Sequence, residues 1–217
     1  LAYLETGTPS MAGDGALTID PGVVMVNGDQ TAYTGEITLK GGSELKLNTA
    51  SAFNHAQGIT LTGSDDTLTF GSLSQENAAW TSSPTGTASV ALAGAGKDHT
   101  QAGADVTLSG NNSTFAGLFQ IDNDATLQAS QAENLGTANI IDDGTLVFNN
   151  AQDWLLANTV TGSGLAVKKS AGTLSVGASM SGFSGITQIT AGSLVVGEEG
   201  SASSELGGDV VCRRYRY

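Results

Sequence analysis

The stretch that decides the fold is 162–197, which reads GSGLAVKKSAGTLSVGASMSGFSGITQITAGSLVVG. Apolar residues recur there in short pairs with one residue between them, such as Leu174 and Val176, and glycines or other small residues separate the pairs. Alternation with a period of two residues is typical of β-strands that bury one face. The stretch therefore predicts short strands joined by tight corners.

The same apolar-x-apolar unit recurs through the rest of the chain, with turn signals such as Gly41-Gly42 and Asp142-Asp143-Gly144 between the units. The pairs are Ile37/Leu39, Leu45/Leu47, Ile59/Leu61, Leu68/Phe70, Val90/Leu92, Val106/Leu108, Phe119/Ile121, Leu146/Phe148, Leu165/Val167, Leu174/Val176 and Leu194/Val196. No segment of 12 or more residues keeps a helical apolar stripe, which excludes alternating α/β folds and helix bundles. The chain is predicted to be all-β.

A longer repeat favours a β-solenoid over a sandwich or a barrel. The pattern aromatic-x-Gly-x-x-x-aliphatic starts at Tyr33, Phe115 and Phe183 and ends at Leu39, Ile121 and Ile189. Successive coils of a solenoid solve the same packing problem, so their sequences repeat. With roughly 20 to 25 residues in each coil, the chain is predicted to form a parallel β-helix of about nine coils.

The stretch 162–197 closely resembles the autotransporter-associated β-strand repeat. The pattern of that repeat is G-S-G-x-L-x-K-x-G-x-G-T-L-x-L-x-G, then [YF]-x-G-x-T-x-I-x-A-G-x-L-x-V-G. Weaker echoes lie at 26–47 and 108–129, and Ser170 stands where the repeat usually has glycine. The resemblance implies a right-handed parallel β-helix, the secreted passenger of a Gram-negative type V autotransporter. It also implies a signal peptide and a C-terminal outer-membrane β-barrel in the full-length protein.

The function that the resemblance implies is a non-catalytic adhesin or virulence scaffold, displayed at the bacterial cell surface, which binds a host surface protein or glycan. The stretch 162–197 would also assist folding after secretion, as an autochaperone-type segment. Two alternatives remain, a β-helical polysaccharide hydrolase or lyase and a homophilic self-association module for aggregation or biofilm. We expect one β-helix segment over 1–211, with a loop excursion at about 72–104 and a non-native tail at 212–217.

Composition narrows the choice of partners. The chain carries 21 acidic against 8 basic residues, a net charge of −13, and has no arginine before Arg213. Such a surface repels polyanions, which argues against nucleic acid as a partner. The single cysteine, Cys212, leaves the body without a disulfide or a thiolate metal site. A body without cysteine suits either a cytosolic protein or an exported protein that must stay unfolded while it crosses a membrane.

Paired carboxylates are the first candidates for catalysis, because β-helical polysaccharide-cleaving enzymes use such pairs as acid and base. The pairs are Asp65/Asp66, Asp122/Asp124 and Asp142/Asp143. All of them lie in predicted turns, where aspartate forms local hydrogen bonds that serve no further function. We therefore expect solvated carboxylates with ordinary pKa values, and no catalytic residue.

Metal and nucleophile motifs give no further candidate. His55 and His99 stand alone in polar segments, without the H-x-x-x-H or H-E-x-x-H spacing of metal sites, and are predicted to lie at the surface. Ser184 lacks the spacing of a G-x-S-x-G elbow, and the calcium-binding nonapeptide of some β-solenoids does not occur. No metal and no cofactor are expected.

Overall fold

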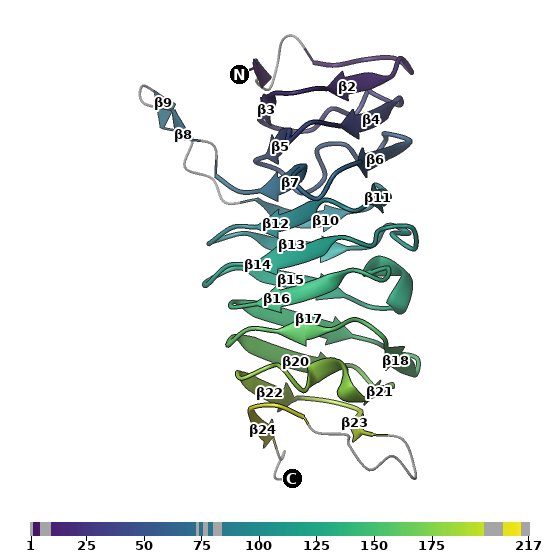
Figure 1. The fold of residues 1–217 in the computed structure, drawn as a ribbon, viewed down its shortest axis with the longest axis vertical. Helices are drawn as coiled ribbons and strands as arrows, with labels where there is room; N and C mark the ends of the chain where they lie inside the picture. The colour runs from purple at the N-terminus through teal and green to yellow at the C-terminus, as the bar shows by residue number, and fades with distance from the viewer. Residues whose placement is uncertain are drawn as a thin grey trace.

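The computed structural model describes residues 2–4, 10–72, 74–75, 78–79, 84–197 and 206–213. The chain forms a right-handed parallel β-helix, which confirms the predicted fold class. It winds through about eight turns, one fewer than expected, into the elongated stack of Figure 1. The turn that leads from Thr67 to its partner Lys97 is longer than the other turns, because it contains the segment between Phe70 and Thr85 as well as a complete coil.

Within the described residues the strands form three walls. The first wall consists of β1 (Ala2–Leu4), β3 (Val23–Val26), β5 (Glu44–Leu47), β7 (Thr67–Phe70), β12 (Lys97–Thr100), β14 (Leu118–Ile121), β16 (Asn139–Asp142) and β19 (Val160–Thr161). The second wall consists of β10 (Thr85–Ala88), β13 (Asp105–Leu108), β15 (Thr126–Ala129), β17 (Thr145–Asn149), β20 (Leu165–Lys169), β22 (Ile186–Ile189) and β24 (Asp209–Cys212).

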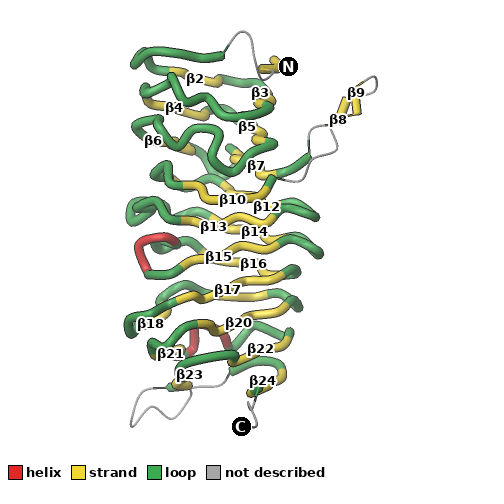
Figure 2. The backbone as a smooth tube through the Cα atoms, turned by 180° about the vertical axis from the view of Figure 1, so that it is seen from behind, coloured by secondary structure: helices red, strands yellow, loops and turns green. Residues whose placement is uncertain are grey.

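The third wall is made of two separate sheets that occupy the same place in the winding order. One contains β2 (Leu17–Ile19), β4 (Glu36–Leu39), β6 (Gly58–Leu61) and β11 (Leu92–Gly94), and the other contains β18 (Trp154–Leu156), β21 (Thr173–Val176) and β23 (Ser193–Val196). Between the two sheets, coils cross this side in irregular segments, one of which contains the 3-10 turn η1 (Ala132–Asn134); a second such turn, η2 (Ala178–Met180), lies on the first-wall side (Figure 2).

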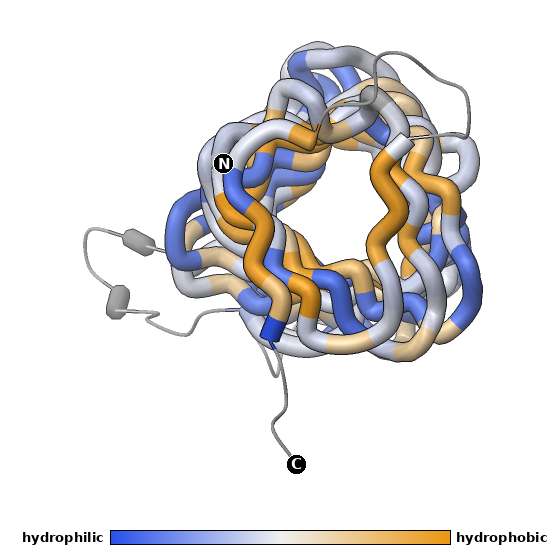
Figure 3. Tube along the Cα trace, turned by 90° about the horizontal axis from the view of Figure 1, so that it is seen from below, coloured by the Kyte–Doolittle hydropathy of each residue, from blue (hydrophilic) through white to orange (hydrophobic). Residues whose placement is uncertain are grey.

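Parallel pairing sets the length of a coil. Thr126 lies opposite Thr145 and Glu44 opposite Thr67, so equivalent positions in neighbouring coils are 19 to 23 residues apart in regular coils. Viewed along the axis, the coils superpose around a common centre (Figure 3). Inward-facing residues stack from coil to coil, as in the buried series Val106, Leu127 and Leu146. This stacking buries the predicted apolar pairs other than Leu165/Val167 and Leu194/Val196.

The three copies of the aromatic-x-Gly pattern lie at three different corners. Tyr33 precedes β4 of the third wall, Phe115 precedes β14 of the first wall, and Phe183 precedes β22 of the second wall. All three rings are buried, and each residue forms an isolated parallel bridge with a glycine one coil earlier. The copies are therefore not a whole number of coils apart, and each marks the end of an irregular segment.

The glycine of this pattern is fixed by contact between coils. A Cβ atom at Gly35, Gly117 or Gly185 would overlap the backbone carbonyl oxygen of a glycine in the preceding coil. By contrast, a Cβ at Gly177 would meet no atom within 4 Å. The first three glycines are therefore required by packing, whereas Gly177 is free of this constraint.

The predicted loop excursion at 72–104 is wrong for its second half. Residues 85–100 form a complete coil through β10, β11 and β12, in register with coils on both sides. Gly94 and Gly96 looked like loop residues, but a Cβ at either position would overlap residues of the coil above. The small side chains therefore reflect close packing of coils.

The excursion itself is confined to the chain between β7 and β10. There β8 (Ser74–Gln75) and β9 (Ala78–Ala79) form an antiparallel pair, which lies to one side of the stack in Figure 1. Trp80 lies outside the described residues. Cys212, the first residue of the predicted non-native tail, belongs to β24 and pairs with Ile189.

One apolar pair has the opposite orientation to the prediction. In β20 the buried residues are Ala166 and Lys168, whereas Leu165 and Val167 are only half-buried. The side chain of Lys168 lies inside the wall, 1% exposed, and its ammonium group donates to the carbonyl oxygens of Lys169, Ser170 and Ala191. An inward lysine with three acceptors replaces the expected aliphatic contact.

Candidate functional site

Asp66 is a structural corner residue, and the prediction that it is solvated is wrong. Its side chain is completely buried, and its two oxygens accept hydrogen bonds from the backbone amides of Gly42, Ser43 and Gly63 and from the Thr62 hydroxyl, at 2.8 to 3.2 Å. Burial alone would raise its pKa, but these hydrogen bonds together outweigh burial and lower the pKa. The neighbouring Asp65 is exposed, so the two carboxyl groups do not act as a pair.

Asp142 is also buried, against expectation, and lies on the other side of the wall from Asp143. Neither oxygen of Asp142 has a hydrogen-bond partner among the described residues, and burial raises its pKa to about 7, although the nearby amides of Gly144 and Leu146 oppose the rise. Asp143 is exposed, and its Oδ1 accepts from the amide and the hydroxyl of Ser163 at 3.0 and 3.2 Å.

Asp98 is a buried carboxyl group that sequence reasoning missed. It points inward from β12 between Leu68 and Phe119 of the adjacent coils, is 0% exposed, and has no hydrogen-bond partner among the described residues. Burial raises its pKa to about 8. The inward hydroxyl of Thr100, two residues further on, likewise has no partner in this part of the chain. The only feature of the sequence that could have indicated this carboxyl group is the polar run Lys97–Thr100, which stands where other strands have an apolar pair.

His99 is not isolated, which corrects the prediction for this residue. It points outward from β12, and its Nε2 donates to Oδ1 of Asp122, in the next coil, at 3.0 Å. Gln120 donates to the same oxygen at 3.3 Å. Asp124, the predicted partner of Asp122, is exposed and has a positive φ of 62°, as expected of a turn residue. Neighbouring coils thus bring together side chains that lie far apart in the sequence.

Asp122 and Asp143 occupy equivalent corner positions on neighbouring coils. The amide of Asp122 bonds to the carbonyl of Thr100, and the amide of Asp143 bonds to the carbonyl of Ile121. Their backbones are therefore about one strand spacing, ~4.8 Å, apart. The backbones of Asp122 and Asp143 are thus neighbours at the edge between the first and second walls, while the Asp122 side chain bonds to His99 of the preceding coil and the Asp143 side chain to Ser163 of the following coil.

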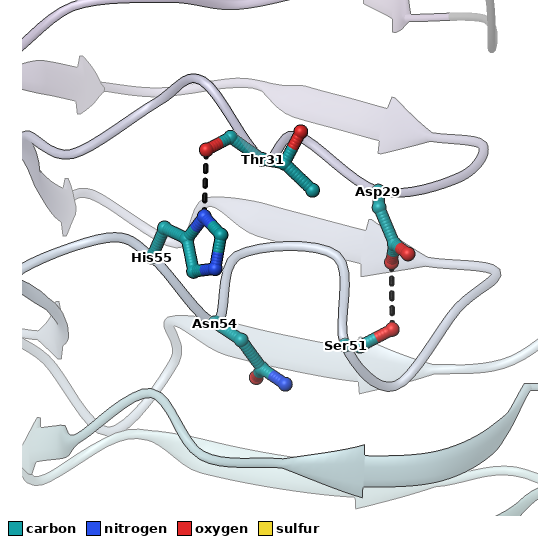
Figure 4. Close-up of a pocket in the computed structure, with 5 residues that line it drawn as sticks. All are labelled: Asp29, Thr31, Ser51, Asn54 and His55. Carbon is teal, nitrogen blue, oxygen red and sulfur yellow. Dashed lines mark hydrogen bonds between the residues drawn. The ribbon is translucent and has the colours of Figure 1, made fainter.

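His55 lines a polar hollow of about 140 Å³ on the side of the second wall (Figure 4). The hollow lies where two successive coils cross this side in irregular segments, 27–35 and 48–57. All of its lining side chains are polar: Asp29, Thr31, Ser51, Asn54 and His55. The prediction that His55 lies at the surface is confirmed, but its grouping with these residues had no sequence signal.

The connectivity in this hollow differs from that of a catalytic triad, although aspartate, serine and histidine are all present. Ser51 donates its hydroxyl hydrogen to Asp29 at 2.6 Å, and Nδ1 of His55 bonds to the carbonyl oxygen of Thr31 at 2.7 Å (Figure 4). In a triad the histidine would accept the hydrogen of the serine hydroxyl. These bonds instead tie one coil to the next and shape the hollow.

A second hollow, of about 180 Å³, lies on the third-wall side. Its lining combines polar residues with an exposed leucine and a buried tryptophan: Ser130, Gln131, Ala132, Gln152, Asp153, Trp154 and Leu155. Asp153 is already engaged, since it accepts from the amide of Thr173 at 2.8 Å, which lowers its pKa. The polar groups here thus serve the coil below.

Across the described residues, no three or more His, Cys, Asp or Glu side chains are grouped so that they could hold a metal ion. In the same residues no helix has the length and apolarity needed to cross a membrane.

Comparison with known proteins gives no match. No protein-family model, no curated protein and no solved structure matches this chain.

Proposed function

We propose that the protein is a secreted passenger of the autotransporter type, which acts at the bacterial cell surface as a non-catalytic binding scaffold. The resemblance of 162–197 to the autotransporter-associated repeat and the solenoid fold support this proposal. In the same proposal, the stretch 162–197 assists folding outside the cell. A host surface protein or glycan would be the ligand.

The observation that carries the proposal is the use of polar side chains at the corners. Each of Asp66, Asp143, Lys168 and Asn54 forms at least one hydrogen bond with the backbone of a neighbouring coil. Such bonds support a long stack of coils, and they leave its lateral surface for recognition. A scaffold that displays irregular segments at its corners is the function that this arrangement supports best.

The test compares adhesion with catalysis on the same purified chain. We expect saturable binding to cultured epithelial cells, measured by flow cytometry with labelled protein, and no reducing sugar released from a polysaccharide panel. A chain of the same composition with a scrambled sequence is the control for binding through charge. Cell binding no greater than that of the scrambled chain would contradict the proposal.

The enzyme alternative is favoured by one observation, that Asp122 and Asp143 occupy equivalent corner positions on neighbouring coils. Glycoside hydrolases flank the scissile bond with two carboxyl groups, one as acid and one as base or nucleophile. Release of reducing sugar that disappears in both Asp122→Asn and Asp143→Asn, and persists in Asp124→Asn, would establish this alternative. Asp124 is the matched control, since it is an exposed turn residue of the same corner.

The self-association alternative is favoured by exposed valines near the last strands. Val195 and Val196 of β23 and Val210 and Val211 of β24 are each 42 to 49% exposed. Exposed apolar patches often form protein contacts. Sedimentation as a dimer at micromolar concentration, reversed by Val210→Thr together with Val196→Thr, would establish it, whereas a monomer at that concentration would contradict it.

A further inference from the structure

We propose that the hollow between 27–35 and 48–57 binds a single neutral sugar ring, through two neighbouring hydroxyl groups of that ring. This inference rests on the proposed function, because it names a ligand class for one site on the binding scaffold. The site residues are Asp29, Thr31, Ser51 and His55, with Asn54 beneath them (Figure 4).

The hollow is held in shape before any ligand arrives. The amide nitrogen of Asn54 donates to the carbonyl of Thr87 at 2.9 Å, and its Oδ1 accepts from the amide of Ser89 at 2.8 Å. Both polar groups of Asn54 thus hold the base of the hollow against β10 and the residue that follows it. The Ser51–Asp29 and His55–Thr31 bonds fix the rim in the same way. A site that is already ordered loses less entropy when it binds.

Hydrogen-bond chemistry defines what the hollow offers. A carbonyl oxygen can only accept, so the bond between His55 and the carbonyl of Thr31 places the hydrogen on Nδ1. In its neutral form His55 therefore presents the lone pair of Nε2. Asp29 receives the Ser51 hydrogen on Oδ1, and its carboxylate keeps further acceptor sites. The ligand must consequently donate at least two hydrogen bonds.

Other ligand classes fit these groups less well. Neither lysine nor arginine lines the hollow, and the carboxylate of Asp29 and the net charge of −13 both repel anions. A metal ion would find only one carboxylate and one imidazole in the lining. An apolar ligand would leave Nε2 of His55 and the remaining acceptor sites of Asp29 without a donor. At about 140 Å³, the hollow is also smaller than sites for drug-sized ligands. Neighbouring hydroxyls on one sugar ring supply two donors in a small volume.

Titration of the isotope-labelled full chain with methyl glycosides of mannose, glucose and galactose, followed by NMR, tests the inference. We expect at least one glycoside to shift the backbone amides of 27–35 and 48–57 and the Nε2 resonance of His55. Asp29→Asn should weaken this binding about tenfold, since it replaces a charge-assisted acceptor, and His55→Phe should abolish the shifts. His99→Gln is the matched control and should bind normally, because that histidine lies on the first wall.

Several results would overturn the inference. One is the absence of shifts at roughly 50 mM glycoside, where a millimolar site would be almost saturated. Others are equal affinity in Asp29→Asn and His55→Phe, or shifts of the same amides by calcium chloride alone or by a methyl glucuronide at equal concentration. If Asp29→Asn fails to give the β-rich circular dichroism of the parent chain, Thr31→Val takes its place, and unchanged affinity there also counts against the site. Absence of glycoside shifts in a parent chain that still adheres to cells would refute this site and leave the scaffold proposal standing.

Discussion

Two neighbouring strands of the first wall lie beside two very different buried carboxyl groups. Asp66 closes the corner before β7, where four donors hold it as an anion and its pKa is lowered. Asp98 lies in β12, the next strand of the same wall, with no partner among the described residues and a pKa raised to about 8. Burial is complete at both positions, so the difference comes from the donors that surround each group.

This contrast shows that burial alone does not define the role of an acidic residue. Asp66 is worth stability because it satisfies backbone amides that would otherwise be unpaired at a corner. Asp98 costs stability when ionised, because the interior offers it neither a charge nor a donor. Asp66 therefore stabilises the corner of its coil, whereas Asp98 lowers the stability of the adjacent coil when it is ionised.

The largest expected effect is a loss of stability as the pH rises from 5 to 8. Asp98 and Asp142, with pKa values of about 8 and 7 in the fold against 3.8 as the ordinary value, stay protonated in the folded chain while the unfolded chain has lost those protons. Stability therefore falls as pH rises between these values, by up to about 1.4 kcal/mol per pH unit for each group. Urea denaturation at a series of pH values measures this slope.

The control for this slope is a pair of substitutions. Asp98→Asn should flatten the dependence whatever its effect on absolute stability, and Asp124→Asn, at an exposed turn, should leave it unchanged. Stability that is constant or rises from pH 5 to 8 would contradict the assignment. Asp66 acts in the opposite sense, because its lowered pKa contributes stability that is lost only as the pH falls below its ordinary value.

Removing the Asp66 side chain should have the next largest effect. Asp66→Ala leaves the amides of Gly42, Ser43 and Gly63 without their acceptor, so we expect a loss of about 3 kcal/mol in the free energy of unfolding at pH 7. Asp65→Ala is the matched control at the exposed neighbour, with an expected change within about 0.5 kcal/mol. Equal effects of the two substitutions would remove the distinction on which the comparison rests.

Lys168 extends the comparison to a buried cation. Its ammonium group has three carbonyl acceptors, and burial lowers its pKa. Lys168→Met should cost about 2 kcal/mol, because it leaves these carbonyls without a donor. Lys169→Met, at the exposed adjacent position, should change stability little. Chemical denaturation of both variants measures the difference, and a stabilising Lys168→Met would show that the three bonds do not offset desolvation.

The smallest effect is a gain at Asp98. Asp98→Val should stabilise the chain by about 1 kcal/mol at pH 7, since it replaces an unpartnered carboxyl by an aliphatic residue in a series that contains Leu68 and Phe119. Hydrogen exchange should then slow in β12 at pH 8 and change little in β16. Destabilisation by Asp98→Val would contradict this expectation and indicate that the carboxyl group is hydrogen-bonded in the folded chain.

The strands could be predicted from the sequence because burial of one strand face is a local pattern, clear at Leu45/Leu47 and Leu146/Phe148. The coil at 85–100 was missed because Asp98 and Thr100 take the places of an apolar pair there. The inverted face of β20 was missed because only the register against β17 turns Lys168 inward.

The candidate sites were mostly beyond sequence reasoning, for one physical reason. The partners of His99 and His55 lie 23 and 24 residues away, in the next coil or the preceding one. Which residues meet across coils depends on the register of a whole coil, and a single inserted residue would change it. The sequence predicts a turn at Asp66, but it does not show that the amides of Gly42 and Ser43 in the preceding coil donate to this side chain.

The aromatic-x-Gly corners have a consequence for how the molecule presents itself. The irregular segments that end at Tyr33, Phe115 and Phe183 lie on the second, third and first walls, respectively. They therefore face three different directions, at three different heights along the axis of the β-helix. A flat partner that approaches from one direction faces one of these three segments, and the direction sets the height of that segment along the β-helix. The direction from which a partner approaches the long axis therefore determines which irregular segment it contacts.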